Sequence, residues 1–161
     1  MGEKDSCASG GAKQWACNVD AGLDSQTKNK DISQQEFDQQ YRCRAEEAAR
    51  YGNAEAMFFL GCELDQEPTL QESSRYFEQA SALGHTYTKW CHGINLLSGH
   101  GTEKDEARGL LLIRQSAEEK FEGAIRFVSD AYAHGAYGFP QNEELAAEWR
   151  SKPADKDVIH Y

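Results

Sequence analysis

The sequence predicts an all-α fold, an α-solenoid of stacked antiparallel helix hairpins. Residues 84–117 contain two stretches with apolar side chains three and four residues apart, the spacing of one helix face, around a polar turn. Similar stretches precede and follow this one, as in a repeat architecture. The chain has only three prolines and no alternating run of valine and isoleucine, so strands have little support.

The first residues, 1–33, are expected to form an irregular N-terminal cap segment. They are rich in glycine and polar side chains, which is typical of a tail or linker. However, Trp15 lies between Cys7 and Cys17, and an aromatic side chain between two cysteines favours a segment anchored on a folded core. We therefore expect a degenerate, partly helical cap here.

A capping helix and three repeats are expected to follow. The apolar residues of the helix over 34–51 lie on one face, and the helix is predicted to end at Gly52, the residue type that most often follows a helix. The repeats are expected at residues 52–83, 84–119 and 120–150, with residues 151–161 as a C-terminal tail.

The turns within the repeats carry signals for the ends of helices. In the central repeat, Gly99 and Gly101 can adopt the positive φ that ends a helix. Asp105 is placed to accept hydrogen bonds from the free N–H groups that begin the next helix. Asn142 has the same place in the third repeat, and the first repeat has a shorter turn. Each repeat is thus predicted to be one αα-hairpin.

These repeats resemble the Sel-1-like repeat, a relative of the tetratricopeptide repeat with a longer loop. The match rests on AEAMFFLG at 54–61, GHG at 99–101 with Asp105, AAEW at 146–149 and EAARYG at 47–52. Three residues depart from the pattern: His92 stands at a usual leucine, Arg126 at a usual aromatic residue and Lys120 at a usual glycine. The period and the small residues still recur in every repeat, so the resemblance implies a superhelix similar to that of tetratricopeptide repeats.

Charge and hydropathy exclude several classes of partner. The formal net charge is −10 and the isoelectric point is near 4.9, whereas a nucleic-acid surface needs a basic stripe. The sequence has no run of about 18 apolar residues for a transmembrane span, and no signal sequence starts at Met1. We presume that a signal peptide preceded this sequence, and the sequence leaves open whether the native N-terminus carries a lipid anchor.

The five cysteines allow two interpretations. In a reducing compartment they would be small buried side chains, and in an oxidising one they would form disulfides. The helices on either side of Gly52 should pair antiparallel, which places Cys43 and Cys62 at nearly equal heights. A bridge between these two is feasible if their side chains face each other. Cys7 and Cys17 would form the second pair.

The sequence leaves open whether the cysteines are reduced or form disulfides, and each state indicates a different cellular compartment. Two disulfides would indicate a periplasmic or secreted protein, with Cys91 left over and buried. Five reduced thiols would fit a reducing cytosol equally well. We expect the periplasm, because the family resemblance described below also points there.

Enzyme activity and a bound cofactor find no support in the sequence. It lacks a glycine-rich phosphate loop, His-Glu-x-x-His, Gly-x-Ser-x-Gly and a Cys-x-x-Cys pair. His85, His92 and His100 are seven and eight residues apart, whereas ligands on one helix face lie three or four apart, so no metal site is expected. Adjacent glutamates such as Glu46 and Glu47 diverge on a helix, which favours solvated faces over acid–base catalysis.

The surface of the solenoid is the predicted binding site. Stacked hairpins place their first helices along the inner wall, where positions not used in packing face a partner. Aromatic residues are enriched at protein interfaces. The predicted partner-binding residues are Glu55, Phe59, Glu63, Tyr87 and Asn95 on the first helices, with Tyr137 and Phe139 in a glycine-rich loop. For the two loop aromatics, packing onto their own repeat is an equal alternative.

Two classes of function follow from the resemblance. Small, acidic, cysteine-bearing chains of Sel-1-like repeats are similar to periplasmic immunity proteins that bacteria carry against type VI secretion lipase effectors of the phospholipase D class. This similarity implies one protein partner, a secreted lipase, that is bound tightly and inhibited. The alternative is a general adaptor of the bacterial envelope or of host interaction. A β-lactamase-like hydrolase is disfavoured, because the paired cysteine spacing of such relatives is absent.

Overall fold

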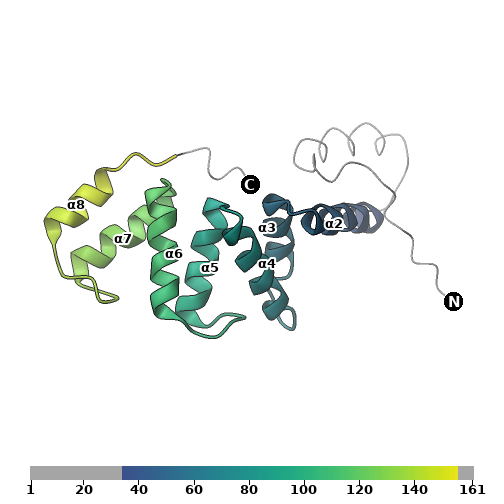
Figure 1. Ribbon diagram of the computed structural model, residues 1–161, viewed down its shortest axis with the longest axis horizontal. Coiled ribbons are helices and arrows are strands. Elements are labelled where there is room, and N and C mark those ends of the chain that lie inside the picture. Colours follow the sequence, from purple (N-terminus) through teal and green to yellow (C-terminus); the bar gives the residue numbers. More distant parts are fainter. Residues whose placement is uncertain (1–33, 156–161) are drawn as a thin grey trace.

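The computed structural model describes residues 34–155, and for residues 34–37 it describes the helix alone. Within this range the chain forms helices joined by turns, without strands (Figure 1). The helices are α2 (Gln34–Arg50), α3 (Ala54–Glu63), α4 (Leu70–Ala82), α5 (Thr86–Ser98), α6 (Glu106–Glu118), α7 (Glu122–His134) and α8 (Glu143–Ser151).

The helices pair as hairpins that stack in chain order. α3 packs with α4, α5 with α6 and α7 with α8, and successive hairpins meet where α4 contacts α5 and α6 contacts α7. α2 packs on α3 at the start of the row, and the helices follow one another along the long axis of the molecule (Figure 1). The predicted all-α solenoid is therefore confirmed.

The same two-residue connection, which we call a joint, precedes each of the three hairpins. The helix before each joint is followed by a residue with positive φ: Gly52 at 81°, Gly84 at 92° and Lys120 at 70°. The N–H groups of this residue and of the next donate to carbonyl oxygens of the preceding helix over 2.9–3.1 Å. This is the Schellman arrangement, which satisfies the last free carbonyls of a helix.

The second residue of each joint begins the following helix. Asn53 accepts the N–H of Ala56 through Oδ1 (2.9 Å), and His85 accepts the N–H of Thr88 through Nδ1 (3.2 Å). Phe121 has the same place but makes no side-chain cap, and it is only 3% exposed. At the third joint, packing of an aromatic ring therefore takes the place of capping.

Lys120→Gly is expected to raise the free energy of unfolding by about 0.5–1 kcal/mol, because a side chain at positive φ crowds its own backbone and glycine does not. Urea denaturation would measure the change. The reciprocal variant Gly84→Lys, at the equivalent joint, should lower the free energy of unfolding by a similar amount. A destabilised Lys120→Gly protein would contradict this account of the joint.

The turns within the hairpins confirm the predicted helix ends. Asp105 and Asn142 each accept, through Oδ1, the N–H of the residue three positions later at 3.0 Å. Gly99 and Gly101 have φ angles of 78° and 64°. In the first hairpin Thr69 has the place of Asp105 without capping the helix; its hydroxyl instead donates to carbonyls of the turn before it.

Two hydrophobic clusters hold much of the core of the described part of the chain. One lies among α2, α3 and α4 and includes Leu60, and the other among α6, α7 and α8 and includes Ile113 and Val128. In the second repeat, the place of Leu60 and Val128 is taken by His92, which is only 2% exposed. Neither ring nitrogen of His92 has a hydrogen-bond partner among the described residues. The second repeat therefore buries a polar ring where its neighbours bury an aliphatic side chain.

The helices α5 and α6 meet at two glycines. A Cβ atom on Gly109 would lie 2.7 Å from the carbonyl oxygen of Gly93, and a Cβ atom on Gly93 would lie 2.9 Å from that of Gly109. A side chain at either position would thus press on the backbone of the other helix, and at Gly93 also on the side chain of Ile113, 2.8 Å away. The two glycines allow the backbones of α5 and α6 to approach closely.

The predicted bridge between Cys43 and Cys62 is wrong, because Cys62 is a free thiol. Equal height on two helices does not fix the directions of the side chains. Burial, and then the nearby Cys62, raises the pKa of Cys91 on α5, so Cys62 lies close to α5. Cys91 is also free and is half-buried. The other predicted pair, Cys7 and Cys17, lies outside the described residues.

Candidate functional site

A continuous row of aromatic side chains crosses all three hairpins. Successive rings lie with their centroids 5.0–5.8 Å apart. We call this row the aromatic stripe, and in order of contact it consists of Phe58, Tyr87, Phe121, Trp90, Phe127 and Tyr137. Each contact of this kind contributes about 0.5–1.5 kcal/mol beyond the burial of area, so the stripe also ties the hairpins together.

The stripe has buried anchors and a partly exposed edge. Phe58 and Phe121 are 7% and 3% exposed and belong to the core. Tyr87, Trp90 and Phe127 are half-buried and come from α5 and α7, the first helices of their hairpins. The stripe therefore presents aromatic surface that is held rigidly from beneath, which lowers the entropy lost when a partner binds.

Sequence reasoning missed most of this edge. Trp90 follows the apolar spacing of a core position in its helix, yet it is only half-buried. Phe127 has the repeat position of Phe59 and Cys91, all three half-buried. Because Phe59 was among the predicted binding residues, its equivalence to Phe127 is the sequence signal that could have identified Phe127.

The residues predicted on the first helices take different places. Tyr87 belongs to the stripe, and Phe59 lies apart from it, with its ring 4.8 Å from the ring of a tyrosine on α2. Glu55 is half-buried and Glu63 is exposed at the end of α3. Asn95 is buried, at 9% exposure, so its side chain adds little to the surface.

The two predicted loop aromatics also separate. Tyr137 has a φ of 54°, is 48% exposed and reaches the ring of Phe127 at 5.1 Å, where it ends the stripe. Phe139 instead packs edge-on against Tyr132 at 4.9 Å, with the guanidinium of Arg114 at 6.0 Å from its ring centre. Phe139 is thus part of the packing of its own repeat, whereas Tyr137 stays at the surface.

Tyr87 of the stripe and two nearby thiols, Cys62 and Cys91, are neutral at ordinary pH. Burial, with Cys91 and Cys62 as lesser causes, raises the pKa of Tyr87 to about 12. Burial likewise raises the pKa of Cys91 to about 12, and partial burial followed by Asp65 and Glu63 raises the pKa of Cys62 to about 11. Both thiols are therefore protonated at neutral pH, and the thiol is the less nucleophilic form of cysteine.

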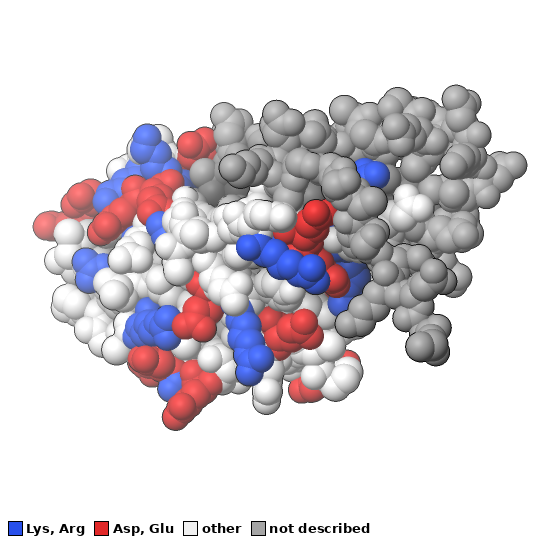
Figure 2. Space-filling model, turned by 45° about the vertical axis from the view of Figure 1, so that its right-hand side comes forward, with Lys and Arg blue, Asp and Glu red and all other residues white. Residues whose placement is uncertain are grey.

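Charged pairs alternate with the stripe along the first helices. Lys89 on α5 pairs with Glu119, and Arg126 on α7 pairs with Glu122 at 3.0 Å. Figure 2 shows acidic and basic side chains interspersed over the face in view. The exposed pair of Arg126 and Glu122 adds about 0–1 kcal/mol to stability, so its main effect is to place charge beside the apolar edge.

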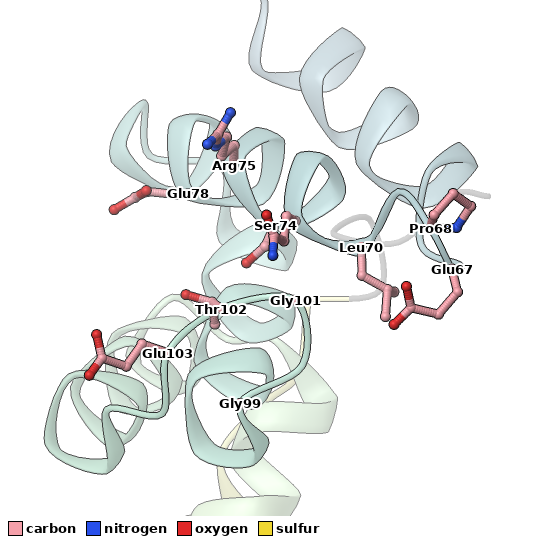
Figure 3. Close-up of a pocket in the computed structure, with 11 residues that line it drawn as sticks. Glu67, Pro68, Leu70, Ser74, Arg75, Glu78, Gly99, Gly101, Thr102 and Glu103 are labelled. Carbon is pink, nitrogen blue, oxygen red and sulfur yellow. The ribbon is translucent and has the colours of Figure 1, made fainter.

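Two grooves lie at equivalent places, each between the second helix of one hairpin and the turn within the next. The first groove, about 700 Å³ in volume, has α4 as one wall and the turn after α5 as the other (Figure 3). Its walls include Gln71, Ser74, Arg75 and Glu78 on α4, and Gly99, Gly101, Thr102 and Glu103 in the turn. The second groove, about 390 Å³, lies between α6 and the turn after α7. Neither was predicted, because each forms only where two repeats meet.

Two further kinds of site were sought among the described residues. Across residues 34–155, no group of three or more histidine, cysteine, aspartate or glutamate side chains is arranged to bind a metal ion. In the same range, no helix has the length and apolar character needed to cross a bilayer.

Comparison with known proteins identifies the fold. No protein-family model and no curated protein sequence matches the chain. Among solved structures, a Sel1 repeat protein from Oxalobacter formigenes is 22% identical over 66% of this chain and 83% of its own, with a TM-score of 0.59. The protective antigen c5321 of uropathogenic Escherichia coli, described as displaying an SLR fold, is 24% identical with a TM-score of 0.64. The match covers 86% of this chain but only 29% of c5321. The chain thus has the Sel1-like repeat fold.

Proposed function

We propose that this chain, whose fold is that of Sel1-like repeat proteins, is a protein-binding module that holds one partner on the aromatic stripe. The observation that carries the proposal is the partly exposed edge of Tyr87, Trp90, Phe127 and Tyr137, anchored on buried rings. Rigid aromatic side chains are the commonest hot spots of protein interfaces. The repeat fold itself supports a role in protein interaction, because stacked hairpins form an extended surface.

For the partner, we propose a secreted lipase of the phospholipase D class, which the chain inhibits in the periplasm as an immunity protein. The family resemblance of the sequence supports this choice, together with its small size and net charge of −10. In this proposal the chain acts without catalysis of its own, by covering the active site of the lipase.

The test is an inhibition assay with purified phospholipase D effectors of type VI secretion systems, following hydrolysis of phosphatidylcholine. Stoichiometric loss of activity with one effector is expected. Phe127→Ser should weaken binding about 30-fold, the effect of losing about 2 kcal/mol at a hot spot. Serine is close in size to Cys91, which has this position in the preceding repeat, so the fold should persist.

One control variant makes the assay specific to the stripe. Tyr51→Ser removes an aromatic ring that is 69% exposed outside the stripe, and it should leave inhibition unchanged. Tight binding without loss of lipase activity would indicate that the chain is an adaptor and not an inhibitor. If Phe127→Ser and Tyr51→Ser bind the partner equally well, the stripe is not the binding surface.

A further inference from the structure

The two grooves occupy the same place in successive repeats but differ in chemistry. Asp105 and Thr69 both precede the second helix of their hairpins, which aligns α6 with α4. In this alignment the first groove has Gln71, Ser74, Arg75 and Glu78 where the second groove has Ala107, Leu110, Leu111 and Arg114. A polar wall in one repeat has therefore become a largely apolar wall in the next.

The apolar wall of the second groove is open to solvent. Leu111 is 57% exposed, at the position that holds a charged residue, Arg75, in the first groove. Across the groove, Tyr137 is 48% exposed, and Phe139 and Pro140 complete the opposite wall. Exposed apolar patches with a polar rim mark binding sites on soluble proteins.

Among the described residues that line this groove, the charged side chain is that of Arg114. Arg114 is exposed at its edge, and no aspartate or glutamate is among the described residues that line it. Arg114 forms no ion pair within the described part of the chain. At the equivalent position of the first groove, Glu78 is paired with Arg108 at 2.8 Å. In a chain with a net charge of −10, the second groove is thus locally basic.

We propose that the second groove binds an extended peptide segment of a partner protein, in which an apolar side chain stands next to an aspartate or glutamate. The apolar side chain packs between Leu111 and Phe139. The carboxylate pairs with the planar guanidinium of Arg114, which can donate two parallel hydrogen bonds to it. The volume of about 390 Å³ suits a short segment and not a folded domain. This site is separate from the aromatic stripe except at Tyr137, which borders both.

The probe is a pair of capped hexapeptides, Gly-Ser-Leu-Asp-Ser-Gly and the same peptide with lysine in place of aspartate. Each is titrated to millimolar concentration into the ¹⁵N-labelled protein, with amide shifts as the measurement. The aspartate peptide is expected to shift residues 107–114 and 137–140 and to bind about tenfold more tightly than the lysine peptide. Leu111→Arg, which installs the residue of the first groove, should abolish these shifts.

Reversal of the charge at residue 114 gives a second measurement. Its expected result is an inverted peptide preference, which a misfolded protein would not show. Arg114→Glu installs the residue of the equivalent first-groove position and should invert the preference, so that the lysine peptide binds more tightly. Arg75→Ala, in the first groove, is the control and should leave both affinities unchanged. These variants lie outside the stripe, so their outcome is independent of the proposed lipase inhibition.

Three outcomes would overturn the proposal. One is the absence of shifts in the second groove with the aspartate peptide, and another is equal affinity for the two peptides. The third is a concentration-dependent dimer, seen by sedimentation velocity, that Leu111→Arg dissociates. That result would assign the apolar wall to a second copy of the chain.

Discussion

Gly109→Ala is expected to lower the free energy of unfolding by about 2 kcal/mol, although alanine is normally the better helix former by about 1 kcal/mol. The added Cβ atom would lie 2.7 Å from the carbonyl oxygen of Gly93 and 3.2 Å from the side chain of Leu97. A carbonyl oxygen cannot rotate away as a side chain can, so α5 and α6 must separate. Their separation would loosen the central hairpin and both of its contacts with the neighbouring hairpins.

Chemical denaturation followed by circular dichroism would measure this loss. Gln115→Ala is the matched control, because residue 115 is exposed on the same helix and its substitution tests helix propensity alone. The control should be neutral or slightly stabilising. A Gly109→Ala protein as stable as the Gln115→Ala protein would show that the two helices do not meet as closely as described.

His92→Leu is expected to raise the free energy of unfolding by about 2 kcal/mol, because a buried polar group without a hydrogen bond costs about 1–3 kcal/mol. His92 is 2% exposed, and the equivalent residues Leu60 and Val128 are 1% and 0% exposed. Leucine at this position restores the residue of the first repeat. Urea denaturation at pH 7.5 would measure the gain, and no change or a loss would contradict it.

The same variant should flatten the dependence of stability on pH. Burial, and then the nearby charge of Arg108, lowers the pKa of His92 against a small opposing effect of Glu78. Below the unfolded value of about 6.5, the unfolded chain takes up a proton that the folded chain does not. The contribution of neutral His92 to the free energy of unfolding is therefore fully present above about pH 6.5. It is lost as the pH falls from there toward the lowered pKa, by up to about 1.4 kcal/mol per pH unit.

A second histidine limits how far the pH dependence should flatten. Burial also lowers the pKa of His85, so His92→Leu should reduce the slope of stability between pH 6.5 and pH 5 without abolishing it. An unchanged slope in His92→Leu would mean that this ring is protonated in the folded protein.

The fold was predictable because its signals are local and repeated. Asp105, Asn142 and Gly99 lie next to the helix ends that they define, so the sequence around each is sufficient. Lys120 illustrates a stronger form of the same point. It breaks the local rule for a residue at positive φ, yet the repeat period assigned it the place of Gly52 and Gly84, where the structure has it.

The candidate site was less predictable because it depends on directions and on contacts between repeats. For Cys43 and Cys62, the sequence predicts the height of each residue along its helix. It does not predict the direction in which each side chain points around the helix axis, and a disulfide depends on that direction. Asn95 shows the effect of a neighbouring turn. Asn95 has the repeat position of Glu63, which is exposed and is followed by a short turn. The turn after α5 is longer, and it folds back so that two of its N–H groups donate to the carbonyl of Asn95.

The joints at Gly52, Gly84 and Lys120 bear on how such a chain can change length during evolution. Each joint uses both of its residues, one to close the helix before it and one to begin the helix after it. An inserted residue would rotate every later hairpin about the axis of the row. The turns within hairpins already differ in length, since one runs from Leu64 to Thr69 and another from Gly99 to Asp105. The fold should therefore tolerate insertions and deletions best in the turns at the rim that carries the grooves, because a change there leaves the stacking of the repeats unchanged.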